Sequence, residues 1–564
     1  MAKHLNIVIG GDAGQGLVTL GSLLAKGLVR SGYSIVVIQS YQSRIRGGHN
    51  TFTIRVSDGE IVAPQEPVDI LVALNAETIR LHEAELSGHG VIVADAALAA
   101  EAGGAEFLAV PFSELGSKRV ANVVALGVTA SLVGLHHDRV SQTLADFFGK
   151  KHPEATEENQ QALEKAFAWL SEQSVSMEKL PAVDDPPRRM MMNGNEAIAL
   201  GALSAGLRFC SFYPMTPATS INLGVISHAK QMGVIVEQAE DEIAAINMAL
   251  GASFAGAPSM VATSGGGFAL MAEAVSLAGQ TETPIVVVVA QRPGPATGLP
   301  TRTEQGDLEF VLHAGHGEFP RAILAPGTVE ECFHLTRKAF ELAEKYQSPV
   351  FVLTDQFLAD SYRAVTPFDA ANLEPVRPGA DLSEASLPYR RFALTKNGVS
   401  PRLIPGATEH LVVADSDEHT EDGRLTEDLA VRRQMVDKRL RKHEGLRADT
   451  VAPDWAGDAG PEILLVSWGS TKGSVSEAAS TLRPRGQRVA TLHFSQVWPL
   501  VPEHFLRYFE DAERVVSVEG NALGQFARLI RRETGFEIRS QVRRYDGLPI
   551  TPEYILEALD GQER

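Results

Sequence analysis

Residues 5–16 of this 564-residue chain read LNIVIGGDAGQG, a short apolar run that ends in glycines at positions 10, 11, 14 and 16. A helical pattern, LVTLGSLLAKGLVRSG, follows at 17–32, and a second apolar run, YSIVVI, at 33–38. A strand, a glycine turn, a helix and another strand make the βαβ signature of a parallel sheet. The sequence therefore predicts that the chain opens with an α/β unit.

Two more units of alternating strands and helices follow this opening. The first unit has further candidate strands at 70–74 and 90–94, and ends in a polar helix near 155–175 and the turn-rich PAVDDPPRR (181–189). Candidate strands of the second unit, which begins near Asn193, are 234–237, 259–263, 284–290, 321–324 and 349–354. Those of the third unit are 462–466, 487–492 and 514–518, followed by a helix at 523–533.

The region between the second and third units is less regular. Residues 365–455 carry proline-rich pieces, the acidic run DSDEHTEDG (415–423) and the basic helix VRRQMVDKRLRK (431–442). Such a composition is typical of an extended connection whose charged helix is mainly solvated. We therefore expect an α/β fold with domains at 1–180, 190–375 and 456–564, and a linker region at 376–455.

Composition excludes several classes of function. The formal charge of -19 disfavours binding to nucleic acid or to an anionic membrane surface. The apolar run at 284–290 is far shorter than the roughly 20 residues of a membrane helix, and the N-terminus shows no cleavable signal pattern. Two cysteines, Cys210 and Cys332, favour a reducing, cytoplasmic setting and are too few for an iron–sulfur cluster. No metal site is predicted.

Two glycine-rich segments are suited to an anionic ligand. GGDAGQG (10–16) is neither a GxGxxG nor a Walker motif, yet it turns backbone N–H groups outward at a helix start. SRIRGGHN (43–50) sets two arginines beside glycines, which suits a phosphate-bearing ligand. Close packing of a helix on a strand, or a salt-bridged loop, explains each segment equally well without a ligand.

Four short segments of the second unit form a more specific set. YPMTPAT (213–219) holds Thr216 between two prolines that stiffen the backbone. TSGGG (263–267) follows a candidate strand and precedes a helix. Arg292, in QRPGPATGLPT (291–301), stands at the end of a strand, where open α/β sheets bind ligands, and can grip a carboxylate. The segments QGDL (305–308) and HAGHGE (313–318) add polar groups that suit the same cleft.

The acidic run EQAEDE (237–242) lies where a helix begins. Carboxylates at such a position are favoured by the helix dipole, which accounts for most of them. Glu242 differs, because at helical spacing it shares a face with Ile246 and Ala249 ahead of Gly251. This position is drawn into an apolar setting and suits acid–base work.

In these segments the chain resembles the 2-oxoacid:ferredoxin oxidoreductases. Residues 193–360 are similar to the family's alpha subunit, with the YPxTP, ExExAAIxxALGAS, TSGxG, QRxGPxTGxPT and QxDL elements in order. Residues 1–180 resemble its gamma subunit, fused in front. Residues 456–564, with VEGNALGQ (518–525) and YDGLP (545–549), resemble its transketolase C-terminal-like domain. The resemblance implies a Rossmann-like gamma domain, a pyrimidine-type thiamine diphosphate domain and this third domain.

The resemblance also implies roles for individual residues. In the wider superfamily the glutamate that activates thiamine diphosphate precedes a packing glycine by nine residues, which fits Glu242 and Gly251, with Glu240 as the main rival. Thr216, Arg292 and Tyr213 would contact the substrate. The remaining expected contacts are Gly265 and Gly267 with the cofactor, and Gly14, Gly16, Arg46 and Gly47 with coenzyme A.

A partner chain is expected for the same reason. The sequence lacks the GDG segment and following Asn that hold Mg2+ and the diphosphate in thiamine enzymes. A beta subunit would supply that site and an iron–sulfur cluster, in a dimer of alpha–beta heterodimers that reduces ferredoxin. The fused arrangement looks most like 2-oxoglutarate enzymes, which make succinyl-CoA. Arg302, Arg44 and His49 are unranked candidates for the distal carboxylate.

Other interpretations of the sequence stay open at this point. Pyruvate and branched 2-oxoacids are alternative substrates. A nonredox thiamine-dependent decarboxylase or transferase subunit would need the same glutamate. A noncatalytic scaffold subunit would keep the fold without the chemistry.

Overall fold

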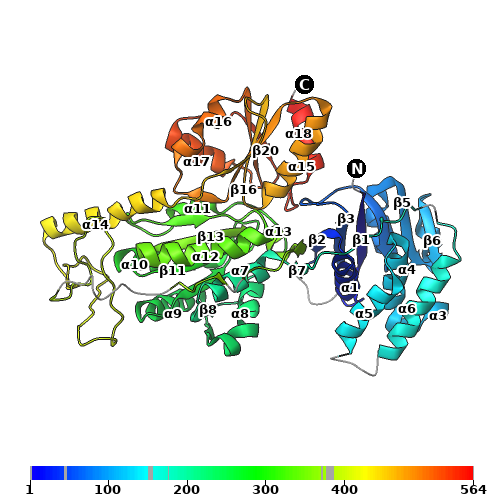
Figure 1. The fold of residues 1–564 in the computed structure, drawn as a ribbon, viewed down its shortest axis with the longest axis horizontal. Coiled ribbons are helices and arrows are strands. Elements are labelled where there is room, and N and C mark those ends of the chain that lie inside the picture. Colours follow the sequence, from blue (N-terminus) through cyan, green and yellow to red (C-terminus); the bar gives the residue numbers. More distant parts are fainter. Residues whose placement is uncertain are drawn as a thin grey trace. The chain divides into compact units, whose positions relative to one another are not determined.

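The computed structural model describes residues 3–42, 48–149, 156–175, 177–369, 372–376 and 387–562. It separates into two compact units, each described by itself (Figure 1). Unit 1 comprises Met1–Asn193, Asp360–Phe368 and Thr551–Tyr554, and unit 2 comprises Gly194–Ala359, Asp369–Ile550 and Ile555–Arg564. Three β-sheets flanked by helices confirm the α/β fold, whereas the domain borders at 1–180, 190–375 and 456–564 remain a prediction.

Unit 1 is built on one sheet of eight strands in the order β6-β5-β4-β1-β3-β2-β14-β7. These strands are β1 (His4–Asp12), β2 (Ser34–Ser40), β3 (His49–Ser57), β4 (Val68–Ala73), β5 (Leu86–Asp95), β6 (Glu106–Val110), β7 (Met190–Met192) and β14 (Arg363–Val365). Its helices are α1 (Leu17–Arg30), α2 (Ala76–His82), α3 (Phe112–Leu115), α4 (Ala121–Val133), α5 (His137–Phe148) and α6 (Thr156–Ser171).

The opening sheet is mixed, whereas the βαβ pattern predicted a parallel one: β1, β4, β5 and β6 are parallel, but β1 and β2 are not neighbours. Strand β3 lies between β1 and β2 and pairs antiparallel with both of them. Its buried residues Phe52, Ile54 and Val56 alternate with other side chains, as expected of a strand that packs one face on a core. A glycine turn starts the helix after β1 but does not determine which strand pairs with β1. Here β3 pairs with the preceding strand β2 and also with β1, and so separates the two.

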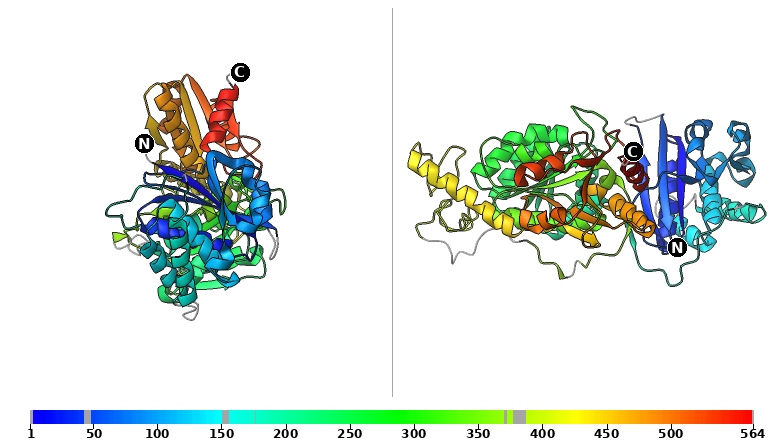
Figure 2. Two further views of the ribbon diagram at one scale, coloured as in Figure 1. Left: turned by 90° about the vertical axis from the view of Figure 1, so that its right-hand side faces the viewer. Right: turned by 90° about the horizontal axis from the view of Figure 1, so that it is seen from above.

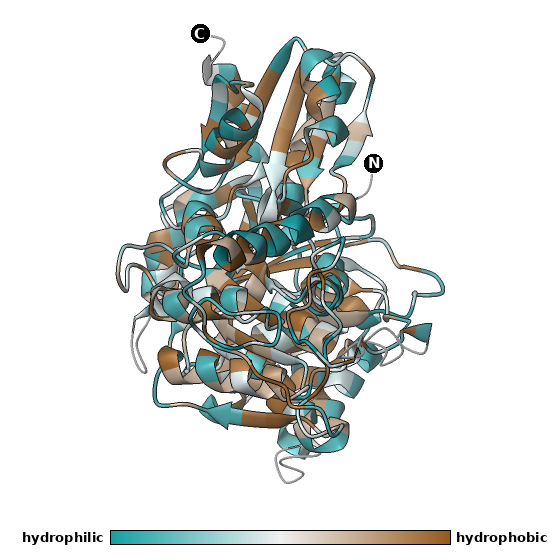
Figure 3. Cartoon of the chain, turned by 90° about the vertical axis from the view of Figure 1, so that its left-hand side faces the viewer, coloured by the Kyte–Doolittle hydropathy of each residue, from teal (hydrophilic) through white to brown (hydrophobic). Residues whose placement is uncertain are grey.

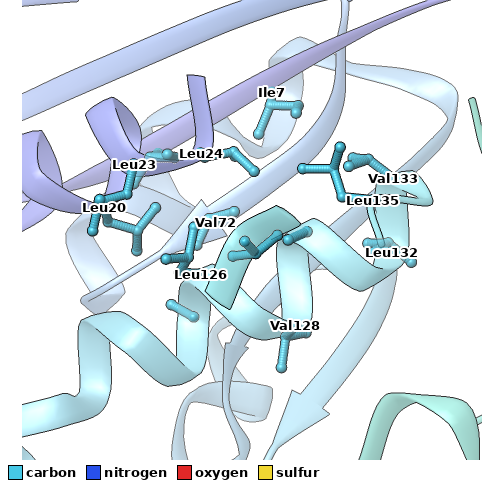
Figure 4. Close-up of a cluster of buried hydrophobic side chains, with 14 of the residues drawn as sticks. Ile7, Leu20, Leu23, Leu24, Val72, Leu126, Val128, Leu132, Val133 and Leu135 are labelled. Carbon is cyan, nitrogen blue, oxygen red and sulfur yellow. The ribbon is translucent and has the colours of Figure 1, made fainter. Parts of the chain in front are cut away.

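Leucines at helical spacing hold α1 on this sheet. Leu20, Leu23 and Leu24 of α1 pack with Ile7 of β1 and with Val72 of β4 in one buried cluster (Figure 4). Residues of α4 and the segment after it complete the cluster, among them Leu126, Val128, Leu132, Val133 and Leu135. Burial of an apolar stripe against the sheet is what fixes the orientation of α1.

Unit 2 contains a sheet of seven strands, ordered β18-β12-β13-β11-β10-β8-β9, and one of five, ordered β15-β17-β16-β19-β20. The strands are β8 (Phe209–Phe212), β9 (Ile235–Gln238), β10 (Ser259–Thr263), β11 (Ile285–Gln291), β12 (Ala322–Leu324), β13 (Pro349–Asp355), β15 (Asp454–Gly457), β16 (Ile463–Trp468), β17 (Val489–Phe494), β18 (Gln496–Trp498), β19 (Arg514–Glu519) and β20 (Ser540–Arg543). The main helices are α7 (Gly194–Ser204), α8 (Thr219–Met232), α9 (Glu242–Phe254), α10 (Gly265–Gln280), α11 (Leu308–His313), α12 (Val329–Tyr346), α13 (Gln356–Asp360), α14 (Leu429–Ala448), α15 (Lys472–Leu482), α16 (Leu506–Glu510), α17 (Gln525–Thr534) and α18 (Pro552–Gln562).

The two sheets of unit 2 share a core. Strands β10, β11 and β13 are parallel and buried along their whole length, which requires helices on both faces. Strand β18 comes from the later part of the chain and pairs antiparallel with β12. One cluster of buried apolar residues spans both sheets, and brown dominates many of their strands in Figure 3. The apolar runs at 259–263 and 284–290 are thus confirmed as strands.

The basic helix α14 is exposed over much of its length, as predicted, but one face of it is buried, which the sequence did not indicate (yellow in Figure 2). Lys438 and Lys442 are fully buried, and both form ion pairs with Glu282, which is equally buried. Burial by itself would raise the pKa of Glu282, but the two lysines and Arg391 hold it well below its usual range. The sequence pattern shows the charges of α14 but not the distant carboxylate that allows them to be buried.

Replacing Glu282 by Gln should destabilise the packing of α14. The change leaves two buried ammonium groups without their anion, which typically costs about 3–5 kcal/mol. We expect this loss in the free energy of opening measured by amide hydrogen exchange along α14. Glu444→Gln, at an exposed position of the same helix, is the control and should change exchange little. Unchanged protection in Glu282→Gln would contradict the importance of this ion cluster.

Candidate active site

Glu242 is the first residue of α9 and is buried, with 4% of its surface exposed. Asp241 caps the helix, because its Oδ1 accepts a hydrogen bond of 2.8 Å from the Ala244 N–H. Among the residues that the structure describes, Oε1 of Glu242 is buried without a hydrogen-bond partner. Its rival Glu240 is exposed. Of these two glutamates, only Glu242 points into the protein.

Two glycines of TSGGG allow carboxylates to approach the start of α10. A Cβ added at Gly267 would lie 2.6 Å from Oε1 of Glu242 and 2.1 Å from Oγ1 of Thr263. A Cβ added at Gly265 would lie 2.4 Å from Oδ2 of Asp307. Any larger side chain would collide with these groups, so the glycines serve a close approach. The structure therefore brings Glu242, Gly265 and Gly267 together.

Four buried polar atoms surround the start of α10 without a hydrogen-bond partner in the described part of the chain. They are Oε1 of Glu242, Oγ1 of Thr263, Oγ of Ser264 and Oδ2 of Asp307. A buried polar atom that lacks a partner costs about 1–3 kcal/mol, so natural proteins rarely keep several together. The clustering of these four atoms is typical of a binding site for a polar ligand.

Arg292 lies directly after β11, at the carboxyl end of the parallel strands. Its Nη1 donates a hydrogen bond of 2.7 Å to the carbonyl oxygen of Thr216, so the two predicted substrate residues are in contact. Burial lowers the pKa of Arg292, and the nearby Asp307 opposes this shift. Tyr213, on the same segment as Thr216, is 40% exposed. A guanidinium at this place can bind a small carboxylate.

Asp307 completes the cluster. Its backbone N–H donates to Oε1 of Gln291, at the end of β11, over 2.9 Å. Burial raises the pKa of Asp307 to about 6, while Arg292 counteracts part of that shift. The sequence pointed to Asp307 only as one polar group of QGDL, and it missed Gln291. A polar residue that ends a run of buried valines was the available signal.

The segment with Asp307 is tied to the five-stranded sheet by the Gln305 side chain. Its Nε2 donates to the Trp468 carbonyl over 2.8 Å, and its Oε1 accepts from the Gly520 N–H over 2.8 Å. The HAGHGE segment is not part of the cluster, contrary to expectation. The carbonyl of its His316 accepts a bond from Ser276, about 16 Å along α10 from Gly265 by helix rise.

A separate pocket of about 490 Å³ lies in unit 1. Gly14 and Gly16 line it, both with a left-handed backbone, and Gly16 caps the start of α1. Lys118 and Arg119, which the sequence reasoning did not single out, line it too. Arg46 and Gly47, expected at the same site, lie outside the described residues. The pocket thus combines outward N–H groups with two cations, as an anionic ligand requires.

The described residues include neither a cluster suited to a metal ion nor a membrane-spanning helix. No group of three or more His, Cys, Asp or Glu side chains is arranged to hold a metal ion. None of the described helices has the length and apolar character needed to cross a membrane. Cys210 and Cys332 are both free and buried.

Two family models match the chain. Residues 200–438 match the model described as "Pyruvate flavodoxin/ferredoxin oxidoreductase, thiamine diP-bdg". Residues 6–169 match the model "Pyruvate ferredoxin/flavodoxin oxidoreductase". The first match contains Glu242, Arg292 and Asp307, and the second contains the pocket of unit 1.

Relatives match over nearly full length. A 2-oxoacid:ferredoxin oxidoreductase subunit alpha from a Sulfolobus species is 31% identical, covering 100% of this chain and 98% of its own. The 2-oxoglutarate oxidoreductase subunit KorA of Mycobacterium tuberculosis is 29% identical, covering 95% and 88%. The solved 2-oxoglutarate:ferredoxin oxidoreductase of Magnetococcus marinus is 31% identical over 100% of both chains, with a TM-score of 0.94. The resemblance seen in the sequence is confirmed, and this chain belongs to the alpha subunits of the 2-oxoacid:ferredoxin oxidoreductase family.

Proposed function

We propose that this chain serves an enzyme that converts 2-oxoglutarate and coenzyme A into succinyl-CoA and carbon dioxide. The carbon–carbon bond to the carboxylate breaks, a thioester forms, and one proton and two electrons are released. Two ferredoxins take up one electron each. The observation that carries the proposal is the buried Glu242, whose Oε1 meets the glycine cradle of α10.

The residues around Glu242 fit thiamine diphosphate. A buried carboxyl that is held by a capped helix suits a ring nitrogen that must share a proton. Gly267 lets this carboxyl approach the start of α10, where other buried polar atoms also lack partners among the described residues. Thr263 and Ser264 offer further hydrogen bonds. When bound, the cofactor supplies the carbon nucleophile and the electron sink of the decarboxylation. Glu242 would hold the proton at the ring nitrogen, and its burial keeps water away.

Arg292 and Thr216 would hold the carboxylate next to the 2-oxo group of the substrate. Arg292 is positioned by the Thr216 carbonyl, which leaves other guanidinium N–H groups for a bound anion. Support for 2-oxoglutarate comes from the relatives, since the Mycobacterium tuberculosis subunit is named for it and the Magnetococcus marinus structure holds 2-oxoglutarate, coenzyme A and succinyl-CoA. Arg302 and His49 remain candidates for the distal carboxylate, while Arg44 lies outside the described residues.

Coenzyme A is assigned to the pocket of unit 1. Its phosphates are multiply charged anions, and the pocket offers the turn at Gly14 and Gly16 with Lys118 and Arg119. Calorimetric titration with coenzyme A would test the assignment. Lys118→Glu should weaken binding, with Lys179→Glu as a control at an exposed lysine outside this pocket.

A partner chain would cover the edge of the seven-stranded sheet. The elements beside Glu242 expose large apolar side chains: Leu223 and Ile226 on α8, Ile235 on the edge strand β9, and Ile243 and Met248 on α9. We call these five residues the apolar edge. Apolar groups concentrated beside a catalytic candidate are typical of a subunit interface. We assign it to the beta subunit, which would bring the diphosphate, Mg2+ and an iron–sulfur cluster.

Ile243→Lys should weaken assembly with the beta subunit. Ile243 is 50% exposed, so the lysine costs little in the free chain but places a charge in the interface. We expect the dissociation constant to rise by about 100-fold, from roughly 2–3 kcal/mol of lost interface energy. Analytical ultracentrifugation measures it. Leu429→Lys, 84% exposed on α14, is the matched control, and equal affinities of both variants would argue against the apolar edge.

The decisive experiment reconstitutes the chain with its beta subunit. Rates with 2-oxoglutarate, pyruvate and branched 2-oxoacids are compared in the presence and absence of coenzyme A and ferredoxin. Fastest turnover with 2-oxoglutarate, and loss of that turnover without coenzyme A or without ferredoxin, would support the proposal. Turnover without ferredoxin would indicate the nonredox alternative, and the absence of turnover with any 2-oxoacid would indicate a scaffold subunit.

A further inference from the structure

A groove lined by arginines runs along the five-stranded sheet of unit 2. It has a volume of about 780 Å³ and is lined by Arg514, Arg528, Arg531, Arg539 and Arg543, with Glu537 as its one acidic residue. Its lining therefore carries a formal charge of +4 in a chain whose net charge is -19. Neither the candidate active site nor the coenzyme A pocket uses any of these residues.

Two elements present the arginines toward the groove. Arg528 and Arg531 are three residues apart on α17 and so share one helix face. Arg539 lies directly before β20 and Arg543 ends it, and both line the groove. Strand β20 is the last strand of its sheet, so this part of the groove borders a sheet edge. The cations thus line both walls of the groove.

Most of this charge faces solvent. The side chain of Arg539 is 88% exposed and that of Arg531 is 64% exposed. Arg531 pairs with Glu537 at 2.8 Å, and Arg539 approaches the same carboxylate at 3.6 Å, so one anion serves two cations. Like charges around one groove repel each other, and the lining holds one carboxylate against five arginines. An anionic partner would relieve the repulsion.

We propose that this arginine groove docks the acidic surface of an electron-carrier protein. The inference rests on the proposed function, in which two ferredoxins accept the electrons. Charge complementarity selects this occupant: encounters between redox proteins are brief, bury little surface and depend on opposite charges for their rate. Arginine is also the cation most enriched at protein interfaces.

A small polyanion is the less suitable occupant. The cations are spread over α17, β20 and the start of β19 instead of converging on one point, and the side chains of Arg531 and Arg539 are mostly exposed. Compact phosphate sites gather buried donors around one centre. Leu523, Ala527 and Ile538 add a small apolar part to the lining, as in the centre of a weak protein interface.

The test uses the assembled alpha–beta enzyme with two electron acceptors, ferredoxin and the small dye methyl viologen. Arg528→Glu combined with Arg539→Glu brings the formal charge of the lining from +4 to zero. We expect KM for ferredoxin to rise by about tenfold at low salt, and the difference to shrink at high salt. Dye reduction should stay within about twofold. Arg485→Glu, at an exposed arginine outside the groove, is the matched control.

An unchanged KM for ferredoxin in the double variant, beside normal dye reduction, would overturn the docking proposal and leave the proposed function intact. Absence of dye reduction in the unaltered enzyme would instead refute the proposed function. If calorimetry shows that the double substitution abolishes pyrophosphate binding while KM for ferredoxin is unchanged, the groove is a small-anion site. Polyglutamate should inhibit ferredoxin reduction by the unaltered enzyme competitively and spare dye reduction. Failure to inhibit overturns the proposal even if the double variant does not assemble.

Discussion

Glu242→Gln should lower the turnover number of the assembled enzyme by about 10³-fold, in the range seen for the loss of an acid–base group. The amide keeps the size of the side chain and can still occupy the space against Gly267. It cannot carry the proton that a carboxyl holds at the cofactor ring. Assembly with the beta subunit and the thermal stability of the alpha chain should change little. Steady-state ferredoxin reduction with 2-oxoglutarate measures the effect.

Glu240→Gln is the matched control, because Glu240 is two positions away and exposed. It should retain nearly full turnover. Calorimetric titration of each complex with thiamine diphosphate shows whether the variants still bind the cofactor. Near-normal turnover of Glu242→Gln, or a loss of turnover in Glu240→Gln alone, would transfer the role to the rival residue.

Asp307→Asn should remove a pH dependence of substrate binding. Asp307 lies beside Arg292, and its pKa is raised to about 6 by burial and partly lowered by Arg292. Above this pH the carboxylate is charged and competes with the incoming substrate carboxylate for the guanidinium. Below it the carboxyl is neutral and the competition ends. KM for 2-oxoglutarate should therefore rise with pH above about 6, by up to about tenfold per unit.

The asparagine variant should show a flat KM between pH 6 and pH 8, and at pH 8 its KM should lie well below that of the unaltered enzyme. Initial-rate measurements at fixed ionic strength give these values. Glu309→Gln, two positions further along, should keep the original slope. Isothermal calorimetry in two buffers should show proton uptake on substrate binding to the original enzyme only. Parallel pH profiles of KM for the asparagine variant and the original would contradict the proposed competition.

Much of the fold could be predicted because the signals were local. The buried strands β10 and β11 stand out as apolar runs, and the helix that begins at Glu242 follows from its acidic start and apolar face. Strand β3 was missed because its insertion beside β1 depends on pairing between distant parts of the chain, which local patterns do not show. The burial of Lys438 was missed for a similar reason, since its partner Glu282 lies 156 residues away.

The same distinction between local patterns and distant contacts applies to the candidate site. Glu242, Thr216 and Arg292 could be singled out as candidates because each lies in a short segment with a chemical reason for its residue type. Contacts between segments were not visible in the sequence. The bond from Arg292 reaches the Thr216 carbonyl rather than its hydroxyl, and the approach of Asp307 to Gly265 depends on how two loops fold over α10.

The two side-chain hydrogen bonds of Gln305 connect the segment that carries Asp307 to residues near the C-terminal part of the chain. Gly520, whose N–H donates one of these bonds, stands 215 positions further along, and its described neighbours include neither Glu242 nor Arg292. A bulky side chain at position 520 would push on Gln305 and shift the backbone segment that carries Asp307. Substitution of Gly520 should thus change KM for the 2-oxoacid while the fold persists.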